Sequence, residues 1–139
     1  MRQLSEIVCN QHALIMSETE TVKSACGKMR EQRVGSVLVT DAKGMLTGIF
    51  TGRDAVCRVL AAGKSAARTQ LRHVMTPKPT TISPQGKAID ALRLMWDGGF
   101  RHVPLVEDDK IIGIVSRGDF KGAEHGRLEE EREIWEHMR

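Results

Sequence analysis

Apolar side chains with helical spacing recur 66 residues apart along the chain. Residues 21–29 and 87–95 both place apolar side chains at positions i, i+3, i+4 and i+7, which puts four of them on one face of a helix. The two sets are Val22, Ala25, Cys26 and Met29, and Ala88, Ala91, Leu92 and Met95. The pattern predicts two helices of about three turns each, in equivalent places of a duplicated unit.

An apolar run rich in β-branched residues follows each predicted helix, at residues 33–39 and 101–106, and this composition favours a strand. Polar, turn-prone segments at 40–45 and 107–110 separate these runs from a second pair of apolar runs, LTGIF and IIGIV. Two strands joined by such a turn form a hairpin. The spacing between the two copies changes only at the predicted loops, where insertions are tolerated.

The duplicated unit has the predicted order β-α-β-β-α. Short extended pieces at residues 12–17 and 80–84 precede the first helices, and second helices begin near residue 53 and at Gly118 or Asp119. We therefore predict an α+β fold with α/β-type layers. Units of about 55 to 60 residues are too small for a robust core of their own, so we expect the two repeats to pack against each other.

The chain divides into three predicted segments. Their boundaries are 1–66 for the first repeat, 67–124 for the second repeat and 125–139 for a C-terminal helix. Residues 63–79 join the repeats, and their two X-Pro pairs favour extended backbone. In the charge-dense C-terminal segment, Leu128, Trp135 and Met138 follow steps of seven and three residues, which predicts a helix with one narrow apolar stripe.

Length, composition and charge narrow the class of protein. The chain has 139 residues, of which 40% are hydrophobic and 28% charged; these fractions are typical of a folded protein and argue against disorder. No apolar run is long enough to span a membrane, and the N-terminal residues lack a secretory pattern, so we expect no membrane association and a cytoplasmic location. A small, dispersed net charge of +3 and five aromatic residues argue against a nucleic-acid partner.

The cysteines and histidines lack the spacings of metal or catalytic sites. Cys9, Cys26 and Cys57 are odd in number and far apart, so we expect reduced, buried thiols rather than disulfides or a zinc site. The five histidines show no ligand spacing, and no nucleophile elbow occurs. We therefore predict neither a metal site nor a catalytic site.

A heptad is repeated at the end of each predicted hairpin. GIFTGRD at residues 48–54 returns as GIVSRGD at residues 113–119, with glycine, hydroxyl and aspartate in matching places. A hydroxyl three residues before a carboxylate is typical of a capping box at a helix start, which would be a structural role only. A turn from strand to helix also presents N–H groups to a phosphate, and a carboxylate there can accept both hydroxyls of a ribose. This second interpretation predicts nucleotide binding.

With this duplication, the strands GSVLV and RHVPLV and the two heptads, the chain resembles a CBS-domain pair, also called a Bateman module, from about residue 5 to residue 122. The resemblance implies a pseudo-two-fold pair of repeats with a regulatory, signal-transducing role, without catalysis and without an obligatory cofactor. It implies adenosine-containing ligands, namely AMP, ADP or ATP and in some members NAD or S-adenosylmethionine, in clefts between the repeats. It also implies a flat homodimer held through the helices, which the C-terminal stripe would extend, and a regulated enzyme or transporter as partner.

The resemblance assigns nucleotide contacts to matching positions of the two heptads. These positions are Asp54 and Asp119 for the ribose, Thr51 and Ser116 for the phosphate, Ile49 and Ile114 for the adenine, and the intervening Arg53 and Arg117. The heptads therefore predict two sites of the same design, one in each repeat.

Basic residues distinguish the second repeat from the first. Its strand opens with Arg101 and His102, where several nucleotide-binding members carry groups that face the phosphates, and the first repeat has Val34 and Gly35 there. Because charge-assisted bonds are roughly twice as strong as neutral ones, we expect the Asp119 site to bind a nucleotide more tightly. His102 could instead be a strand histidine with one satisfied hydrogen bond.

Two alternatives for the whole chain stay open at this point. The first is a ligand-free interaction or scaffold module in which the heptads serve only as helix caps. The second is a detached regulatory part of a nucleotide-metabolising enzyme such as inosine-monophosphate dehydrogenase.

Overall fold

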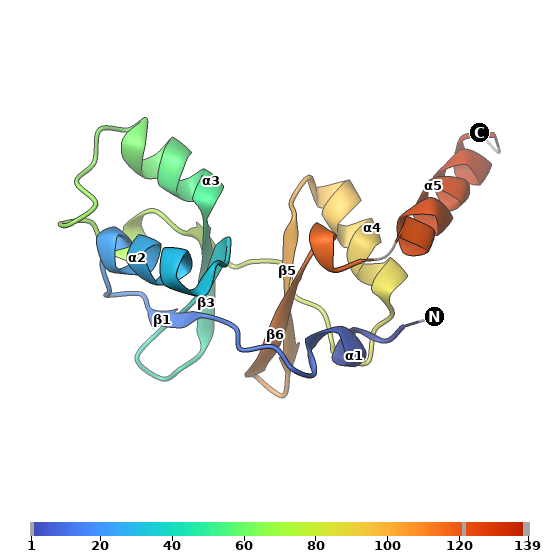
Figure 1. The fold of residues 1–139 in the computed structure, drawn as a ribbon, viewed down its shortest axis with the longest axis horizontal. Helices are drawn as coiled ribbons and strands as arrows, with labels where there is room; N and C mark the ends of the chain where they lie inside the picture. The colour runs from blue at the N-terminus through green and yellow to red at the C-terminus, as the bar shows by residue number, and fades with distance from the viewer. Residues whose placement is uncertain (1, 121, 138–139) are drawn as a thin grey trace. The chain divides into compact units, whose positions relative to one another are not determined.

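The structure of the chain is a computed structural model (Figure 1). It describes residues 2–120 and 122–137, with every side chain in these ranges except those of residue 123 and residues 131–137. Contacts divide the chain into two compact units: the first unit is residues 12–79, and the second unit is residues 1–11 together with residues 80–139. Each unit has a hydrophobic core of its own.

The first unit combines a four-stranded sheet with helices. Its elements in chain order are β1 (Ile15–Ser17), α2 (Val22–Gln32), β2 (Ser36–Thr40), β3 (Leu46–Thr51), α3 (Gly52–Asp54), a π-helical segment that continues α3 (Ala55–Leu60), a 3-10 turn (Leu71–His73) and β4 (Thr76–Pro77). The strands lie in the order β1-β2-β3-β4, in which β1 and β2 run parallel and the other neighbours antiparallel. The predicted order of strand, helix, hairpin and helix is confirmed in this unit.

The second unit repeats this order around a two-stranded sheet. Its elements are α1 (Leu4–Val8), α4 (Ala88–Gly98), β5 (His102–Glu107), β6 (Lys110–Ser116), a 3-10 turn (Arg117–Asp119) and α5 (Gly122–His137). A single parallel bridge from Ile82 to Leu105 repeats the contact of β1 with β2. Asp108 and Asp109 join β5 to β6 with φ values of 50° and 63°, as a two-residue hairpin turn of type I′ requires.

The two helices predicted from the apolar spacing are confirmed as α2 and α4. Every residue of the predicted face of α4 is buried in the core of the second unit. On α2, Val22 and Ala25 are buried, while Cys26 and Met29 are half-buried and pack against the core of the first unit. Fully burying an aliphatic side chain contributes about 1.5–3 kcal/mol, so these faces hold the helices on their sheets.

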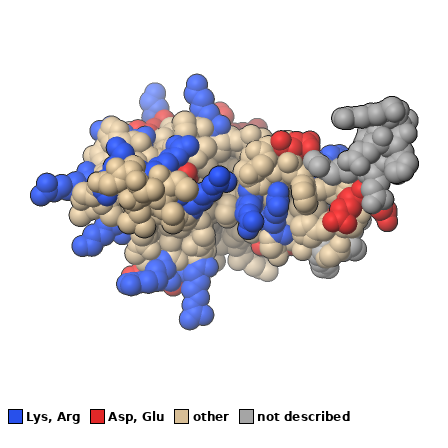
Figure 2. Space-filling view, turned by 90° about the horizontal axis from the view of Figure 1, so that it is seen from above, with Lys and Arg blue, Asp and Glu red and all other residues tan. Residues whose placement is uncertain are grey.

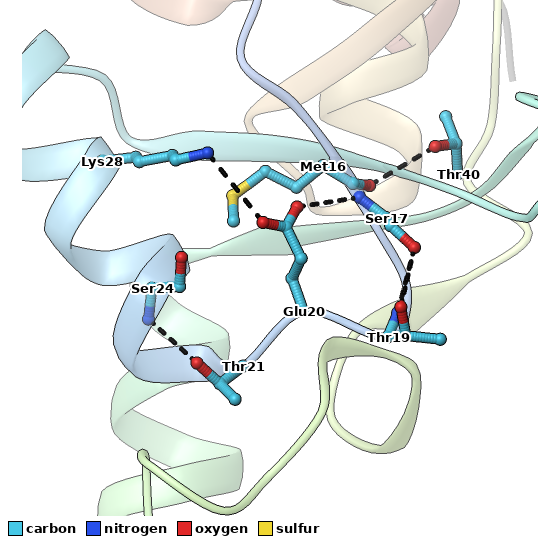
Figure 3. Close-up of polar contacts among 8 residues, drawn as sticks. All are labelled: Met16, Ser17, Thr19, Glu20, Thr21, Ser24, Lys28 and Thr40. Atoms are coloured by element: carbon cyan, nitrogen blue, oxygen red, sulfur yellow. Dashed lines mark hydrogen bonds and ion pairs between the residues drawn. The ribbon is translucent and has the colours of Figure 1, made fainter.

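Polar contacts fix the connection between β1 and α2 (Figure 3). Thr21 caps the helix, because its hydroxyl oxygen accepts a hydrogen bond from the main-chain N–H of Ser24 at 3.2 Å. Glu20 accepts a hydrogen bond from the N–H of Ser17 at 3.1 Å and lies 3.9 Å from the Nζ of Lys28. An N-cap of this kind stabilises a helix by about 1 kcal/mol. The start of α2 is thereby tied to the end of β1.

The hairpin edges of the two units are covered differently. In the first unit β4 pairs with β3, and Ile49 lies opposite Thr76. In the second unit a side chain takes the place of the strand. The Nε2 of Gln11 donates to the carbonyl oxygen of Ile114, its Oε1 accepts from the N–H of Ile114, and both distances are 2.7 Å. The two main-chain groups of Ile114 are therefore satisfied, as partly buried polar groups require.

The division into units differs from the boundary predicted at residue 66. Residues 67–79 belong to the first unit, because Leu71 is buried in its core and β4 pairs with β3. Residues 1–11 belong to the second unit, because Leu4 and Val8 are buried in its core. Each repeat is thus completed by the segment that precedes the other repeat in the chain.

A single helix, α5, stands where the sequence predicted a second-repeat helix and a separate C-terminal helix. The turn after β6 ends at Asp119, and Phe120 is extended, with φ −97° and ψ 145°, and buried. The helix then crosses the predicted boundary at residue 124 without a break. Leu128 of the predicted stripe packs in the core of the second unit, while the side chain of Trp135 and all of Met138 lie outside the described residues.

The cysteines are free, but only one of them is partly buried. Cys26 is half-buried, and burial raises its pKa, whereas Cys9 and Cys57 are exposed; the expected burial is therefore wrong for these two. Among the described residues, no group of three or more His, Cys, Asp or Glu side chains is placed to hold a metal ion. In the same part of the chain, no helix has both the length and the apolar character needed to cross a membrane.

Candidate functional site

The two heptads lie at the ends of β3 and β6, where each strand turns into a helix or a 3-10 turn. Thr51 has φ −119° and ψ 169°, and Ser116 has φ −120° and ψ 166°. In both copies the N–H of the next residue donates to the residue just before the neighbouring strand, from Gly52 to the carbonyl of Gly35 at 3.3 Å and from Arg117 to that of Arg101 at 3.2 Å. The backbone is therefore equivalent where each turn begins, and the two copies differ only after the aspartate.

Both heptad aspartates close a capping box, as the structural interpretation of the motif predicted. One carboxylate oxygen of Asp54 accepts from the N–H of Thr51 at 2.9 Å and from its hydroxyl at 3.2 Å. The matching oxygen of Asp119 accepts from the N–H of Ser116 at 2.7 Å and from its hydroxyl at 3.3 Å. Each aspartate thus uses one oxygen, Oδ2, for the turn, and its second oxygen decides what else it can bind.

The second oxygen of Asp54 is occupied within the first unit. Its Oδ1 accepts from the hydroxyl of Thr76 at 3.2 Å and lies 3.4 Å from the Nε of Arg58. The Asp54 side chain is only 10% exposed. The Nη1 of Arg58 also donates to the carbonyl oxygen of Met75 at 2.9 Å, which anchors the guanidinium beside the carboxylate.

The second oxygen of Asp119 is open. Asp119 is exposed, and its Oδ1 accepts no hydrogen bond from the residues that the structure describes. A carboxylate oxygen has lone pairs for two hydrogen bonds, so this atom can accept hydroxyl donors from a ligand. The equivalent turns therefore present different chemistry: a saturated carboxylate in the first unit and an available one in the second.

His102 lies near the open carboxylate. His102 lies opposite Ser116 in the register of β5 and β6 and is half-buried. Burial, the largest cause, lowers the pKa of His102; the Asp119 carboxylate raises it and the Arg101 guanidinium lowers it. Arg101 itself is exposed. His102 thus feels the charges of both Asp119 and Arg101 within one unit, and the contact of these residues with a nucleotide stays a prediction.

The guanidinium of Arg117 stacks on an aromatic ring. It lies 4.7 Å from the centre of the Trp96 ring on α4, a distance typical of a cation–π contact. The Nε of Arg117 is buried and has no hydrogen-bond partner among the described residues. Its counterpart Arg53 is exposed. Arg117 is therefore held against α4, and the Trp96 ring covers one face of its guanidinium.

The sequence did not single out Arg58, Thr76 or Trp96, although all three contact heptad residues. Arg58 had a signal, because it follows Asp54 by four residues and such pairs meet on a helix. Thr76 had none, since it reaches Asp54 only through the pairing of β4 with β3. The two predicted adenine neighbours also differ, because Ile49 is buried and Ile114 is half-buried.

His102 should make the free energy of unfolding depend on pH. Burial favours its neutral form and lowers its folded pKa below the unfolded value of about 6.5, so the unfolded chain binds more protons in this range. The stabilising contribution is present above the unfolded pKa and is lost as pH falls through the folded pKa. In urea titrations at about pH 7.5 and about pH 5.5, we expect a larger loss for the wild type than for His102→Gln. Equal losses would contradict this.

The charges divide unevenly between the two units. Residues 12–79 contain eleven Lys and Arg against five Asp and Glu, a net formal charge of +6, whereas the second unit has ten against thirteen, a net charge of −3. All eleven cations of the first unit are exposed, and several project from the left part of Figure 2. The net charge of +3 is therefore the sum of two opposed units and is not evenly dispersed.

Comparisons with known proteins agree with the duplicated fold. The CBS domain matches residues 4–60 and 71–126. The CBS domain-containing protein CBSCBSPB2 of Arabidopsis thaliana is 40% identical over 103 residues, which cover 74% of this chain and 19% of that protein. The meiotically up-regulated gene 70 protein of Schizosaccharomyces pombe is 35% identical over 134 residues, which cover 96% of this chain and 18% of that protein. The chain thus spans about a fifth of the length of these relatives.

Solved structures with the same architecture include two CBS-domain proteins. One, from Agrobacterium tumefaciens, is 28% identical, with a TM-score of 0.77 over 84% of this chain and 89% of that chain. Another, from Pyrobaculum aerophilum and complexed with AMP, has a TM-score of 0.82 over 91% of this chain and 98% of that chain; at 20% identity this likeness shows the fold alone. Together with the match to the CBS domain over both repeats, these findings show that the chain belongs to the CBS-domain family.

Proposed function

We propose that the chain is a regulatory module that binds one adenine nucleotide at the turn after β6. The observation that carries this proposal is the open Oδ1 of Asp119, with His102 of β5 near the same carboxylate. A free carboxylate oxygen suits ribose hydroxyls, and the Arg101 guanidinium and the neutral His102 imidazole can both donate hydrogen bonds to a phosphate. The AMP complex of the Pyrobaculum aerophilum CBS protein supports the choice of an adenosine ligand.

Each residue of the turn has a role in this proposal. Asp119 accepts hydrogen bonds from the ribose hydroxyls, while its other oxygen keeps the turn closed. The side chains of His102 and Arg101 bind the phosphate, and the hydroxyl of Ser116 joins them when it turns from Asp119 Oδ2, to which it donates at 3.3 Å. Ile114 offers an apolar contact to the adenine, with its main chain already bonded to Gln11.

Regulation follows from a difference in affinity between conformations. A ligand shifts an equilibrium only as far as it binds one state more tightly than the other. In the proposal the chain catalyses no reaction, is located in the cytoplasm, assembles as a homodimer, and acts on an enzyme or a transporter. The location rests on the sequence pattern of the N-terminal residues and the other parts on the family resemblance, which also makes NAD or S-adenosylmethionine further ligands of the same chemical class.

Calorimetric titration with AMP, ADP, ATP, NAD and S-adenosylmethionine tests the proposal. We expect at least one adenine nucleotide to bind with one site per chain, and to raise the stability by about 2.7 kcal/mol at a concentration 100 times its Kd. Inosine monophosphate serves as a control for recognition of the adenine. If no nucleotide bound and none shifted the melting temperature, the proposal would fail.

A second candidate function is that of an interaction module without a small ligand. The net charge of +6 on the first unit favours it, because exposed cations attract an acidic partner. In this case the only role of the heptads is to cap the turns that follow them, and both heptads do form capping boxes. The same titration separates the two functions, since the second predicts no response to any nucleotide.

A further inference from the structure

Two residues hold the second oxygen of the Asp54 carboxylate, whereas no described residue does so at Asp119. Thr76 donates to Oδ1 from β4, and Arg58 pairs with the same oxygen from the π-helical segment after α3. The Arg58 side chain is 48% exposed, while that of Asp54 is 10% exposed. The ion pair therefore lies at the surface of the first unit, with the carboxylate on its buried side.

The second repeat differs at both of these positions. The heptad spacing of 65 residues that matches Asp54 with Asp119 also matches Arg58 with residue 123, which is alanine. The segment that completes each repeat aligns with a spacing of 67, so that Leu4 corresponds to Leu71 and Cys9 to Thr76. The Sγ of Cys9 donates to the carbonyl of Glu6 at 3.2 Å.

The course of the backbone adds to this difference. After Asp54 the helix continues through the π-helical segment to Leu60, so a residue four positions later reaches back to the carboxylate. After Asp119 the turn stops and Phe120 is extended, so the chain no longer follows one helical path. The first heptad is therefore built to pair with its own helix, and the second is not.

A ribose at Asp54 would have to displace these partners. Its hydroxyls need the oxygen that Thr76 and Arg58 use, and the displaced guanidinium would lose a charge-assisted bond. The gain from new hydrogen bonds is thereby offset by the loss of existing ones. At Asp119 the ribose needs Oδ1, and no partner among the described residues has to leave that atom.

We propose that Arg58 and Thr76 close the first heptad to ribose, so that Arg58 determines the number of nucleotides bound by the chain. This inference rests on the proposed function at Asp119, because it concerns the second of two matching sites. Arg58 is a specificity-determining residue in this proposal, because it blocks nucleotide binding at Asp54 and is not one of the residues that bind the nucleotide at Asp119.

The test replaces the two partners by their counterparts from the second repeat, in the variant Arg58→Ala with Thr76→Cys. Calorimetric titration with AMP should give one site per chain for the wild type and two for the variant. Adding Asp54→Asn to the variant should return the number to one. Arg30→Ala, which removes an exposed arginine of α2 in the same unit, should leave it at one.

The possible outcomes separate this inference from the proposed function. No binding of AMP to the wild type would overturn the proposed function, whereas one site in the wild type and one in the folded double variant would overturn the inference alone. Two sites in the wild type would also overturn it. Arg58→Gln serves as a second variant if the first does not fold, because glutamine can keep a hydrogen bond to the Met75 carbonyl without the charge; it too should bind two nucleotides.

Discussion

Replacing Asp119 by asparagine should weaken the binding of AMP by roughly 10- to 150-fold. A hydrogen bond to a charged group contributes about 1.5–3 kcal/mol, and about 1.4 kcal/mol corresponds to a tenfold change in affinity. Asparagine has the same size, and its carbonyl oxygen can still accept from the N–H of Ser116, so the turn stays closed. What is lost is the charge and the open oxygen. Isothermal titration calorimetry measures the change directly.

Two further variants make this result specific. Asp108→Asn removes the same charge from the exposed turn between β5 and β6, where asparagine tolerates the positive φ of 50°, and it should leave the affinity for AMP unchanged. Asp54→Asn should likewise leave the affinity unchanged, because the Asp54 carboxylate is already bonded inside its own unit and binds no ribose in the wild type. If Asp119→Asn bound AMP with the affinity of the wild type, the Asp119 carboxylate would not be a contact of the nucleotide.

The local parts of the fold could be predicted from the sequence because their signals are local. The spacing of Ala88, Ala91, Leu92 and Met95 defines a buried helical face within one stretch of chain, and the heptads mark the ends of two strands. The capping boxes were visible for the same reason, since Thr51 and Ser116 lie three residues from their aspartates. In each case the partners are neighbours in the sequence.

The parts that the sequence did not predict depend on partners far apart in the chain. Gln11 bonds to Ile114 across 103 residues, and the core that buries Leu4 is formed by residues beyond position 80. Periodicity carries no information about which repeat a flanking segment completes. The closed state of Asp54 has the same origin, because Thr76 reaches it only after β4 has paired with β3. The difference between the two heptads is therefore a tertiary property.

The distribution of charge between the two units is also a tertiary property. The net charge of +3 describes the chain as nearly balanced, yet the first unit carries +6 and the second −3. This division follows from the exchange of residues 1–11 and 67–79 between the repeats as well as from the acidic α5. A sum over the whole chain cannot show it, because opposite charges on separate units cancel only in the total.

Replacing Phe50 by alanine should lower the free energy of unfolding by about 3–5 kcal/mol. Phe50 lies next to the last residue of β3, opposite Val37, and is fully buried in the core of the first unit. The loss combines the transfer free energy of the ring with the cavity that it leaves. It is a large share of the roughly 5–15 kcal/mol that stabilises a typical protein of this kind. Urea titration followed by circular dichroism measures it.

Leu60→Ala is the matched control, because it also truncates a large apolar side chain in the first unit. Leu60 is 73% exposed, so its truncation should change the stability by no more than about 0.5 kcal/mol. Phe50→Leu, which keeps part of the buried volume, should fall between the two. A loss in Phe50→Ala no larger than that in Leu60→Ala would mean that the strand leading into the first heptad is not held by its core, and the contrast between a closed Asp54 and an open Asp119 would then lose its structural basis.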